Sequence, residues 1–261
     1  MPAEVNAATE LPLAPPGLLR KGGLTLLATA LALVLLGQFT HLDLLLADRS
    51  FDAALRQFPW RDSWFADVLM HRWLKLPLSL FATGLLLAAL SERLWGRPRL
   101  QPGDRWRLRA SAALALCIPL TISLAKQRSA SHCPWGLERY GGNAAYLRLL
   151  DAVPASFEAG GCFPAGHASS ALWLAGLCLW WLPTRPRMAA LVFAAGLGAG
   201  FIVGWVQQLR GAHFLSHTLW SMWIAAAWVW AVLLAFALAQ RSRRDAAFAV
   251  PAPNTTRACR W

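Results

Sequence analysis

Residues 161–183 read GCFPAGHASSALWLAGLCLWWLP, a turn of small residues that ends in His167 and continues directly into an apolar segment. Glycine lets the backbone approach an anion closely, and the start of a helix offers free N–H groups and the positive end of a dipole. A second stretch, RGAHFLSH at residues 210–217, places His213 before another apolar segment. The two stretches predict helices that each begin with a histidine and a turn suited to bind phosphate.

The composition indicates an integral membrane protein. The 261 residues are 57% hydrophobic and only 15% charged, with a mean hydropathy of +0.41, which is more apolar than an ordinary soluble domain. The net charge of +12 does not indicate nucleic-acid binding, because the arginines gather between apolar segments and no basic run is interleaved with aromatic residues. Most of the 15 tryptophans lie near the ends of apolar stretches, as in membrane-interface belts.

Six stretches are long and apolar enough to cross a bilayer, which takes roughly 20 residues per helix. They lie at about 23–42, 74–94, 108–125, 167–183, 189–208 and 217–240. We therefore expect an all-α, polytopic six-helix bundle at 23–240, preceded by a cytoplasmic segment at 1–22 and followed by a cytoplasmic tail at 241–261. No cleavable signal sequence is evident before the first stretch, so we expect that stretch to remain as an anchor.

The distribution of basic residues predicts the orientation. One set of connections and both flanks are rich in them: Arg20, Lys21, Arg93, Arg97, Arg99, Arg105, Arg107, Arg109, Arg185, Arg187, Arg241, Arg243 and Arg244. The positive-inside rule assigns this side to the cytoplasm. Lys126, His167 and His213 then open on the external face, which in a bacterium is the periplasmic face of the inner membrane.

Within the external segment 43–73, residues 51–73 combine aromatic and aliphatic residues with charges. An amphipathic helix lying along the membrane interface has this composition. A loop folded over the bundle explains it equally well, and the sequence does not decide between the two.

Two cysteines, Cys133 and Cys162, fall in the same external loop. If that side is oxidising, we expect a disulfide between them, with two free thiols as the alternative. Closing such a loop stabilises a fold by roughly 3 kcal/mol in the chain-entropy model.

Two groups on the external side are candidates for phosphate chemistry. Lys126 lies just beyond an apolar segment, where a cation binds phosphate strongly because water is partly excluded, although a lysine that reaches toward the lipid headgroups has the same position. His167 can protonate a leaving oxygen, with the adjacent Gly166 backbone close to the anion. An ordinary helix-capping turn with an incidental histidine is the alternative for that stretch.

The third group is Arg210, His213 and His217. At helical spacing these side chains share a face, so Arg210 can hold phosphate, His213 can attack phosphorus as a nucleophile, and His217 can orient the His213 ring. The alternative is that these polar residues only form hydrogen bonds with one another inside the helix bundle. Ionisable groups at membrane depth are nevertheless costly and usually functional.

A metal site is the rival chemical interpretation, because His213 and His217 are four residues apart with other potential ligands nearby. Zinc hydrolases of the HExxH kind require a glutamate next to the first histidine, and here Phe214 takes that position. No acidic residue accompanies the His167 turn either. We therefore expect no metal and no other cofactor.

The three external groups resemble, in order and spacing, the motifs of the type 2 phosphatidic acid phosphatase family, written K-x6-R-P, P-S-G-H and S-R-x5-H-x3-D. Lys126 and Pro134 match the first motif, Pro164, Gly166 and His167 match the second, and His213 matches the third. The resemblance covers about residues 70–240 and implies a metal-independent reaction. It implies His213 as nucleophile, His167 as general acid and Lys126 as a phosphate ligand.

Several motif positions differ from the family pattern: Cys133 replaces an Arg, Ala165 a Ser, Val206 and Gln207 the Ser-Arg pair, and His217 the Asp. The two arginines that hold phosphate in the family are thus missing from their places. We expect Arg210 to supply one guanidinium and Arg139, or else Arg128, the other, since bidentate guanidinium contacts are hard to replace.

These observations predict a phosphatase that hydrolyses a phosphate monoester or pyrophosphate of an amphiphilic lipid through a phosphohistidine intermediate. Its partners are then the lipid phosphate substrate and the surrounding membrane lipids, and not nucleic acid. Two alternatives remain: a phosphotransferase that uses a lipid phosphate donor, and a non-catalytic binder or carrier of lipid phosphates, which the missing Arg, Ser and Asp favour.

Overall fold

The computed structural model describes residues 13–96 and 100–248, and within these ranges all regular structure is helical. The helices are α1 (Pro16–Phe39), α2 (Leu42–Ser50), η1 (Trp64–Trp73), α3 (Lys75–Trp95), α4 (Pro102–Gln127), η2 (Pro134–Gly136), η3 (Glu138–Tyr140), α5 (Gly166–Leu172), η4 (Trp173–Trp181), α6 (Pro186–Leu209) and α7 (Leu215–Phe248). The fold is therefore all-α, as predicted. Most of the tail predicted at 241–261 lies outside the described residues.

Five helical segments within the described residues are long and apolar enough to cross a membrane. They are Pro16–Phe39, Trp64–Trp95, Pro102–Gln127, Pro186–Leu209 and Leu215–Ala246. The predicted segment at 167–183 corresponds to α5 followed directly by the 3-10 helix η4, which is shorter than these five. The protein is thus a helical membrane protein, and a sixth crossing by α5 and η4 stays a prediction.

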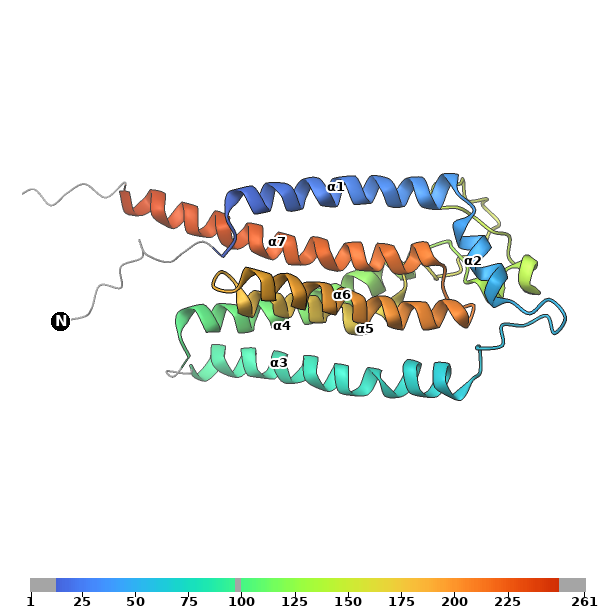
Figure 1. The fold of residues 1–261 in the computed structure, drawn as a ribbon, viewed down its shortest axis with the longest axis horizontal. Coiled ribbons are helices and arrows are strands. Elements are labelled where there is room, and N and C mark those ends of the chain that lie inside the picture. The colour runs from blue at the N-terminus through green and yellow to red at the C-terminus, as the bar shows by residue number, and fades with distance from the viewer. Residues whose placement is uncertain (1–12, 97–99, 249–261) are drawn as a thin grey trace, which may run out of the picture.

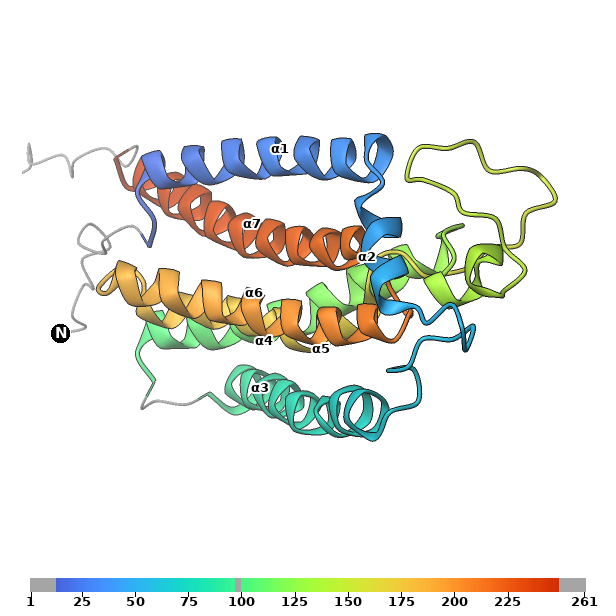
Figure 2. The same ribbon diagram turned by 45° about the vertical axis from the view of Figure 1, so that its right-hand side comes forward.

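The helices form an elongated bundle in which α1 lies along α7 and α3 lies along α4 (Figures 1 and 2). The centre of the bundle is the α5–η4 segment, which packs against both α4 and α6. Its Leu172 and Leu179 are fully buried beside Leu114 and Ile118 of α4. The segment predicted to follow the histidine turn is therefore the core around which the other helices pack.

Glycine permits the tight packing of α6 on this central segment. A Cβ atom at Gly196 would overlap the backbone of Ala175 in η4. Small residues at such contacts let two helix backbones approach closely, which is how membrane helices gain packing energy without a hydrophobic driving force.

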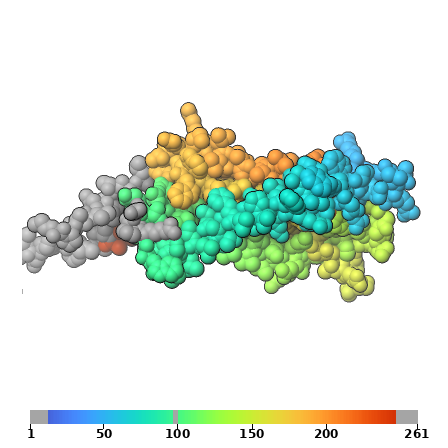
Figure 3. Space-filling view, turned by 90° about the horizontal axis from the view of Figure 1, so that it is seen from below, coloured from blue at the N-terminus to red at the C-terminus, as the bar shows by residue number. Residues whose placement is uncertain are grey.

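The outer surface is apolar, as expected for contact with lipid. On α1, Leu27 is 70% exposed and Phe39 is 71% exposed, and Leu76, Leu80 and Leu87 of α3 are similarly exposed. Figure 3 shows α3 lying across one face of the molecule, with α4 on one side and α6 on the other. Exposed side chains of this size on helices at two sides of the bundle indicate a bilayer, because soluble proteins rarely leave such large apolar areas uncovered.

Residues 51–73 do not form a separate interfacial helix, although residues 42–50 before them form the short helix α2. Residues 64–73 are the π-helix η1, which leads into α3 so that the two form one continuous segment, Trp64–Trp95. Phe58 of the preceding loop is buried in a small cluster with Leu137 and Tyr140 beyond the end of the bundle. The transmembrane segment therefore begins about ten residues earlier than predicted, which brings Asp67 and His71 into the bundle end.

A buried ion pair joins α3 to α4 at the end of the bundle that also holds the start of α1 and the end of α7 (Figure 1). Glu92 is 2% exposed, and its carboxylate accepts a 2.6 Å hydrogen bond from Arg109. Arg105 approaches the other carboxylate oxygen at 3.7 Å. The carboxylate is thus removed from water and depends on these guanidinium groups.

We expect Arg109→Ala to destabilise the protein by about 1–3 kcal/mol, because it leaves a buried carboxylate with only the longer contact to Arg105. Glu92→Gln should cost less, since the remaining Arg109 side chain is 48% exposed and can be hydrated. Thermal unfolding of the purified variants in detergent measures both. A larger loss for Glu92→Gln than for Arg109→Ala would contradict this account of the pair.

Candidate active site

The predicted site residues come together at the opposite end of the bundle. Lys126 lies in the last turn of α4, Gly166 and His167 begin α5, and His213 lies in the connection between α6 and α7. At the same end, η1 contributes His71. The arginine-rich start of α4 and the connection between η4 and α6 lie at the other end (Figure 1). The charge pattern predicts that the basic connections and the site residues lie at opposite ends of the bundle. The fold has this arrangement, whichever face is external.

A cavity of about 490 Å³ opens between α3, α4 and α5. Two lysines and two histidines form one part of its lining: Lys75, Lys126, His71 and His167. The rest consists of hydroxyl side chains, including Ser79, Thr83 and Ser123, and of apolar side chains, including Met70, Ala82, Ala115, Trp173 and Val203. Among the described residues, none with a carboxylate lines this cavity. The cavity therefore suits an anionic group attached to an apolar chain.

Three imidazole rings form a chain that begins in the cavity. His71 Nε2 lies 2.8 Å from His167 Nε2, and His167 Nδ1 lies 3.4 Å from His213 Nε2. The exposure falls along this chain, from 32% for the His71 side chain to 2% for His213. His213 does not line the cavity, because His167 lies between them.

Asp67 fixes the outer end of this chain. Its Oδ1 atom lies 3.2 Å from His71 Nδ1 and accepts a 2.6 Å hydrogen bond from Arg210 Nη2. Arg72 donates to Oδ2 at 2.8 Å. The Arg210 guanidinium also donates to the Arg61 carbonyl and to the Gln207 side chain, so each of its three nitrogens donates to a partner outside the cavity. Arg210 therefore holds Asp67, and the predicted direct contact to phosphate is wrong for this conformation.

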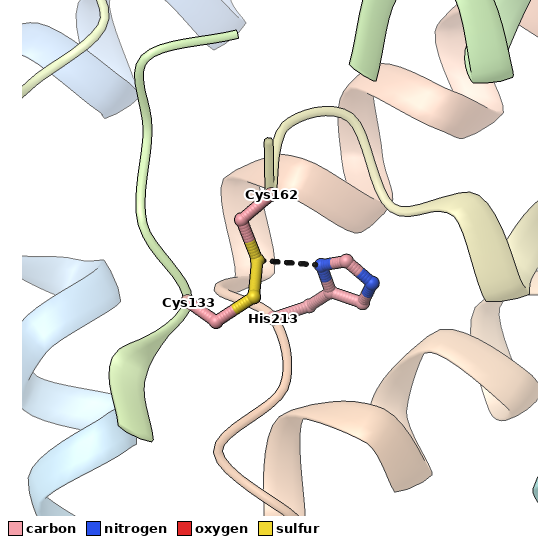
Figure 4. Close-up of side chains that lie close together, drawn as sticks. All are labelled: Cys133, Cys162 and His213. Carbon is pink, nitrogen blue, oxygen red and sulfur yellow. Dashed lines mark hydrogen bonds between the residues drawn. A yellow bond between two sulfur atoms is a disulfide. The ribbon is translucent and has the colours of Figure 1, made fainter. Parts of the chain in front are cut away.

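A disulfide closes the inner end of the chain. Cys133 and Cys162 are joined with an S–S distance of 1.97 Å, and Cys162 Sγ lies 3.5 Å from His213 Nδ1 (Figure 4). These three residues are also the one group of three potential metal ligands among the described residues. A disulfide lacks the thiolate that binds metal, so the group does not form a metal site in this state. Cys133 takes the place of the family's arginine.

His217 does not orient His213 as predicted. Its Nδ1 atom is buried without a hydrogen-bond partner, and its ring packs edge-on against Phe163 and Phe214. The centroids of the His213 and His217 rings are 5.8 Å apart, and His213 Nδ1 faces the Cys162 sulfur.

Arg139 lies outside the cavity. Its guanidinium forms two hydrogen bonds to the Asp48 carboxylate of α2, at 2.8 and 2.7 Å, and these bonds lower the pKa of Asp48. The same carboxylate accepts from Tyr140. Arg139 therefore joins η3 to α2, and its predicted contact with phosphate is wrong for this conformation. Lys75, which sequence reasoning did not select, lines the cavity with Lys126.

Sequence reasoning also missed Asp67 and His71. Both were treated as part of an interfacial segment, and Asp67 as a charge that balances nearby arginines. A signal was present, because an acidic residue and a histidine four residues apart face the same side of a helix. Their position at the start of an apolar stretch is where ionisable residues are costly and usually functional.

A family model of the PAP2 superfamily matches residues 106–241, which is more than half of the chain. The chain belongs to the PAP2 superfamily. No curated protein and no solved structure matches it in the other two comparisons. Membership supports phosphoryl hydrolysis of the phosphatase type. The matched region includes Lys126, His167 and His213 and excludes Asp67 and His71, so the carboxylate–imidazole pair is a feature of this chain beyond the matched region.

Burial, followed by the nearby His217, His167 and Lys126, lowers the pKa of His213 well below its usual range. The unfolded chain binds a proton at this residue below about pH 6.5, and the folded protein does not. Stability should therefore fall as the pH falls from 7 to 5.

Thermal unfolding in detergent across this range measures the effect. His213→Gln should make the pH dependence shallower, and His41→Gln, which changes an exposed histidine on the same side, should leave it unchanged. An equal slope in the His213→Gln variant and the unmodified protein would contradict the assignment.

Proposed function

We propose that this protein is a membrane phosphatase that removes phosphate from an amphiphilic phosphate monoester or pyrophosphate. The observation that carries the proposal is the single cavity in which two lysines and two imidazoles adjoin an apolar wall of membrane helices. A lipid phosphate has the same two parts. Its phosphate pairs with the ammonium groups of Lys75 and Lys126, and its chains extend between α3 and α5 toward the bilayer.

Charge complementarity supports a phosphate rather than a neutral headgroup. The two lysines lie in the cavity lining, whereas the guanidinium groups nearby are engaged by Asp67 and by backbone or amide oxygens. Ammonium groups bind phosphate as point charges and are strengthened where water is partly excluded. Lys126 is the lysine that the family motif also has, and in this chain Lys75 adds a second cation where the two family arginines are missing.

The reaction we propose is a two-step displacement. His213 attacks phosphorus through Nε2 to form a phosphohistidine, for which His167 must first give up its contact with that nitrogen. An imidazole that lines the cavity gives a proton to the departing lipid oxygen, and later accepts a proton from the water that cleaves the N–P bond. We propose that these residues hold phosphate without a metal ion and that the reaction takes place at the periplasmic face of a bacterial inner membrane.

We expect His213→Ala and His167→Ala each to abolish phosphate release from a lipid phosphate such as phosphatidate, while protein yield stays the same. The measurement is free phosphate released by purified protein in detergent, with and without a chelator. Retention of most activity by either variant would refute these roles. Labelled phosphate appearing on an added lipid acceptor, with little released free, would instead establish a phosphotransferase.

Lys126→Ala should lower kcat/KM for the same substrate by about 10²- to 10³-fold, the usual effect of removing one group that stabilises transition-state charge. Arg139→Ala, the matched loss of a cation at the same end of the bundle, should change kcat/KM by less than about threefold, because Arg139 pairs with Asp48 outside the cavity. Equal losses in the two variants would show that the cavity is not where phosphate binds.

A further inference from the structure

His71 is the most exposed of the three linked imidazoles, and it lines the cavity at the mouth of the chain. It is also the one that contacts a carboxylate, through the 3.2 Å approach of its Nδ1 atom to Asp67. His71 is held by a carboxylate on one nitrogen and lines the cavity, where its other nitrogen contacts His167 Nε2. Once that contact opens toward a substrate, the ring has the arrangement of a general acid or base.

The hydrogen bonds of the chain fix how many protons it holds. Four contacts connect Asp67, His71, His167, His213 and the Cys162 sulfur in series. Each contact requires one proton between its two atoms, and both ends of the series, a carboxylate and a disulfide sulfur, only accept. Three neutral imidazoles carry one N–H proton each. A chain in which every contact is a hydrogen bond therefore contains one proton more than three neutral rings supply.

The extra proton is best accommodated on His71. The charged groups around this ring are Asp67 and Arg72 on η1, Lys75 at the start of α3, Lys126 from α4, His167 from α5 and Arg210 from the end of α6. Asp67 is the one acidic group in this set, and it contacts His71 directly. His213, at the far end, is buried away from that carboxylate, where a charged imidazole is costly.

We propose that His71 is the general acid and base of the reaction and that Asp67 positions it, a role the sequence had given to His167. This inference rests on the proposed function. As the P–O bond to the lipid breaks and the bond from His213 Nε2 to phosphorus forms, the proton on His71 Nε2 passes to the lipid oxygen, which leaves as an alcohol. In the second step water forms a P–O bond, the N–P bond breaks, and a water proton returns to His71 Nε2.

The remaining neighbours then have defined tasks. Arg210 is a positioning residue that holds Asp67 through its 2.6 Å contact, and it is only 6% exposed. His167 orders the His213 ring through its Nδ1 atom while the site is empty of substrate. The family has an Asp four residues after the nucleophile, and His217 takes that position in this chain. The carboxylate here is that of Asp67, which contacts a different imidazole, His71, on a different helix.

The experiment compares two phosphate esters that differ in their need for a proton on the leaving group. One is dioctanoyl phosphatidate, whose alcohol leaves poorly without protonation, and the other is an octyl-substituted nitrophenyl phosphate, whose phenolate leaves without it. His71→Asn should lower kcat for phosphatidate by at least about 10²-fold and for the nitrophenyl ester by less than about tenfold. His167→Asn should lower kcat for both esters to a similar extent.

Asp67→Asn should show the same preference for the nitrophenyl ester, and Asp67→Glu should restore much of the activity on phosphatidate. His41→Asn, a change outside the site, should leave both rates unchanged. Size-exclusion profiles in detergent identify variants that fold, and the ratio of the two rates is independent of the folded fraction.

Equal losses on the two esters in both His71→Asn and Asp67→Asn would overturn the role of the pair while leaving the phosphatase assignment intact. Failure of the unmodified protein to hydrolyse either ester would overturn the proposed function and this inference with it. A larger loss on phosphatidate than on the nitrophenyl ester in His167→Asn, and not in His71→Asn, would show that His167 and not His71 is the general acid.

Discussion

The carboxylate of Asp67 holds the site together. It accepts from Arg210 at the end of α6, from Arg72 on its own helix and from His71, and through His71 it reaches His167 at the start of α5. A buried guanidinium needs such a partner, because leaving it unpaired costs several kcal/mol. The position of η1 against α6 and the direction of the His71 ring are therefore set by one interaction, and the cavity between α3, α4 and α5 takes its polar lining from it.

The departures from the family motifs form a connected set in three dimensions. Cys133, in place of an arginine, forms the disulfide to Cys162 that faces His213. Gln207, in place of another arginine, accepts from Arg210 at 2.9 Å. The guanidinium three residues before His213 thus turns toward Asp67 and away from the cavity. The losses at Cys133 and Gln207 are each matched by a neighbour that uses the altered side chain, which argues against a site that has simply decayed.

The sequence predicted the helical membrane fold and the meeting of Lys126, His167 and His213 well, because apolar length and alternation of basic connections depend on local composition. It placed the start of the second transmembrane segment about ten residues late, since the charges of Asp67, His71 and Arg72 interrupt the apolar pattern. Arg139 and His217 were misassigned for another reason. Whether an arginine reaches a cavity or a neighbouring carboxylate depends on packing between η3 and α2, which no local pattern encodes.

The loss of the two family arginines affects how the lysines of the cavity bind the phosphate charge. In the family pattern two guanidinium groups grip the phosphate bidentately, which fixes its orientation as well as its charge. Here the ammonium groups of Lys75 and Lys126 neutralise charge without imposing direction. The orientation of the phosphate must then come from the imidazoles, the Gly166 backbone and the apolar wall that receives the lipid chains. A site built in this way discriminates among substrates mainly through the chains, because that is where its shape is defined.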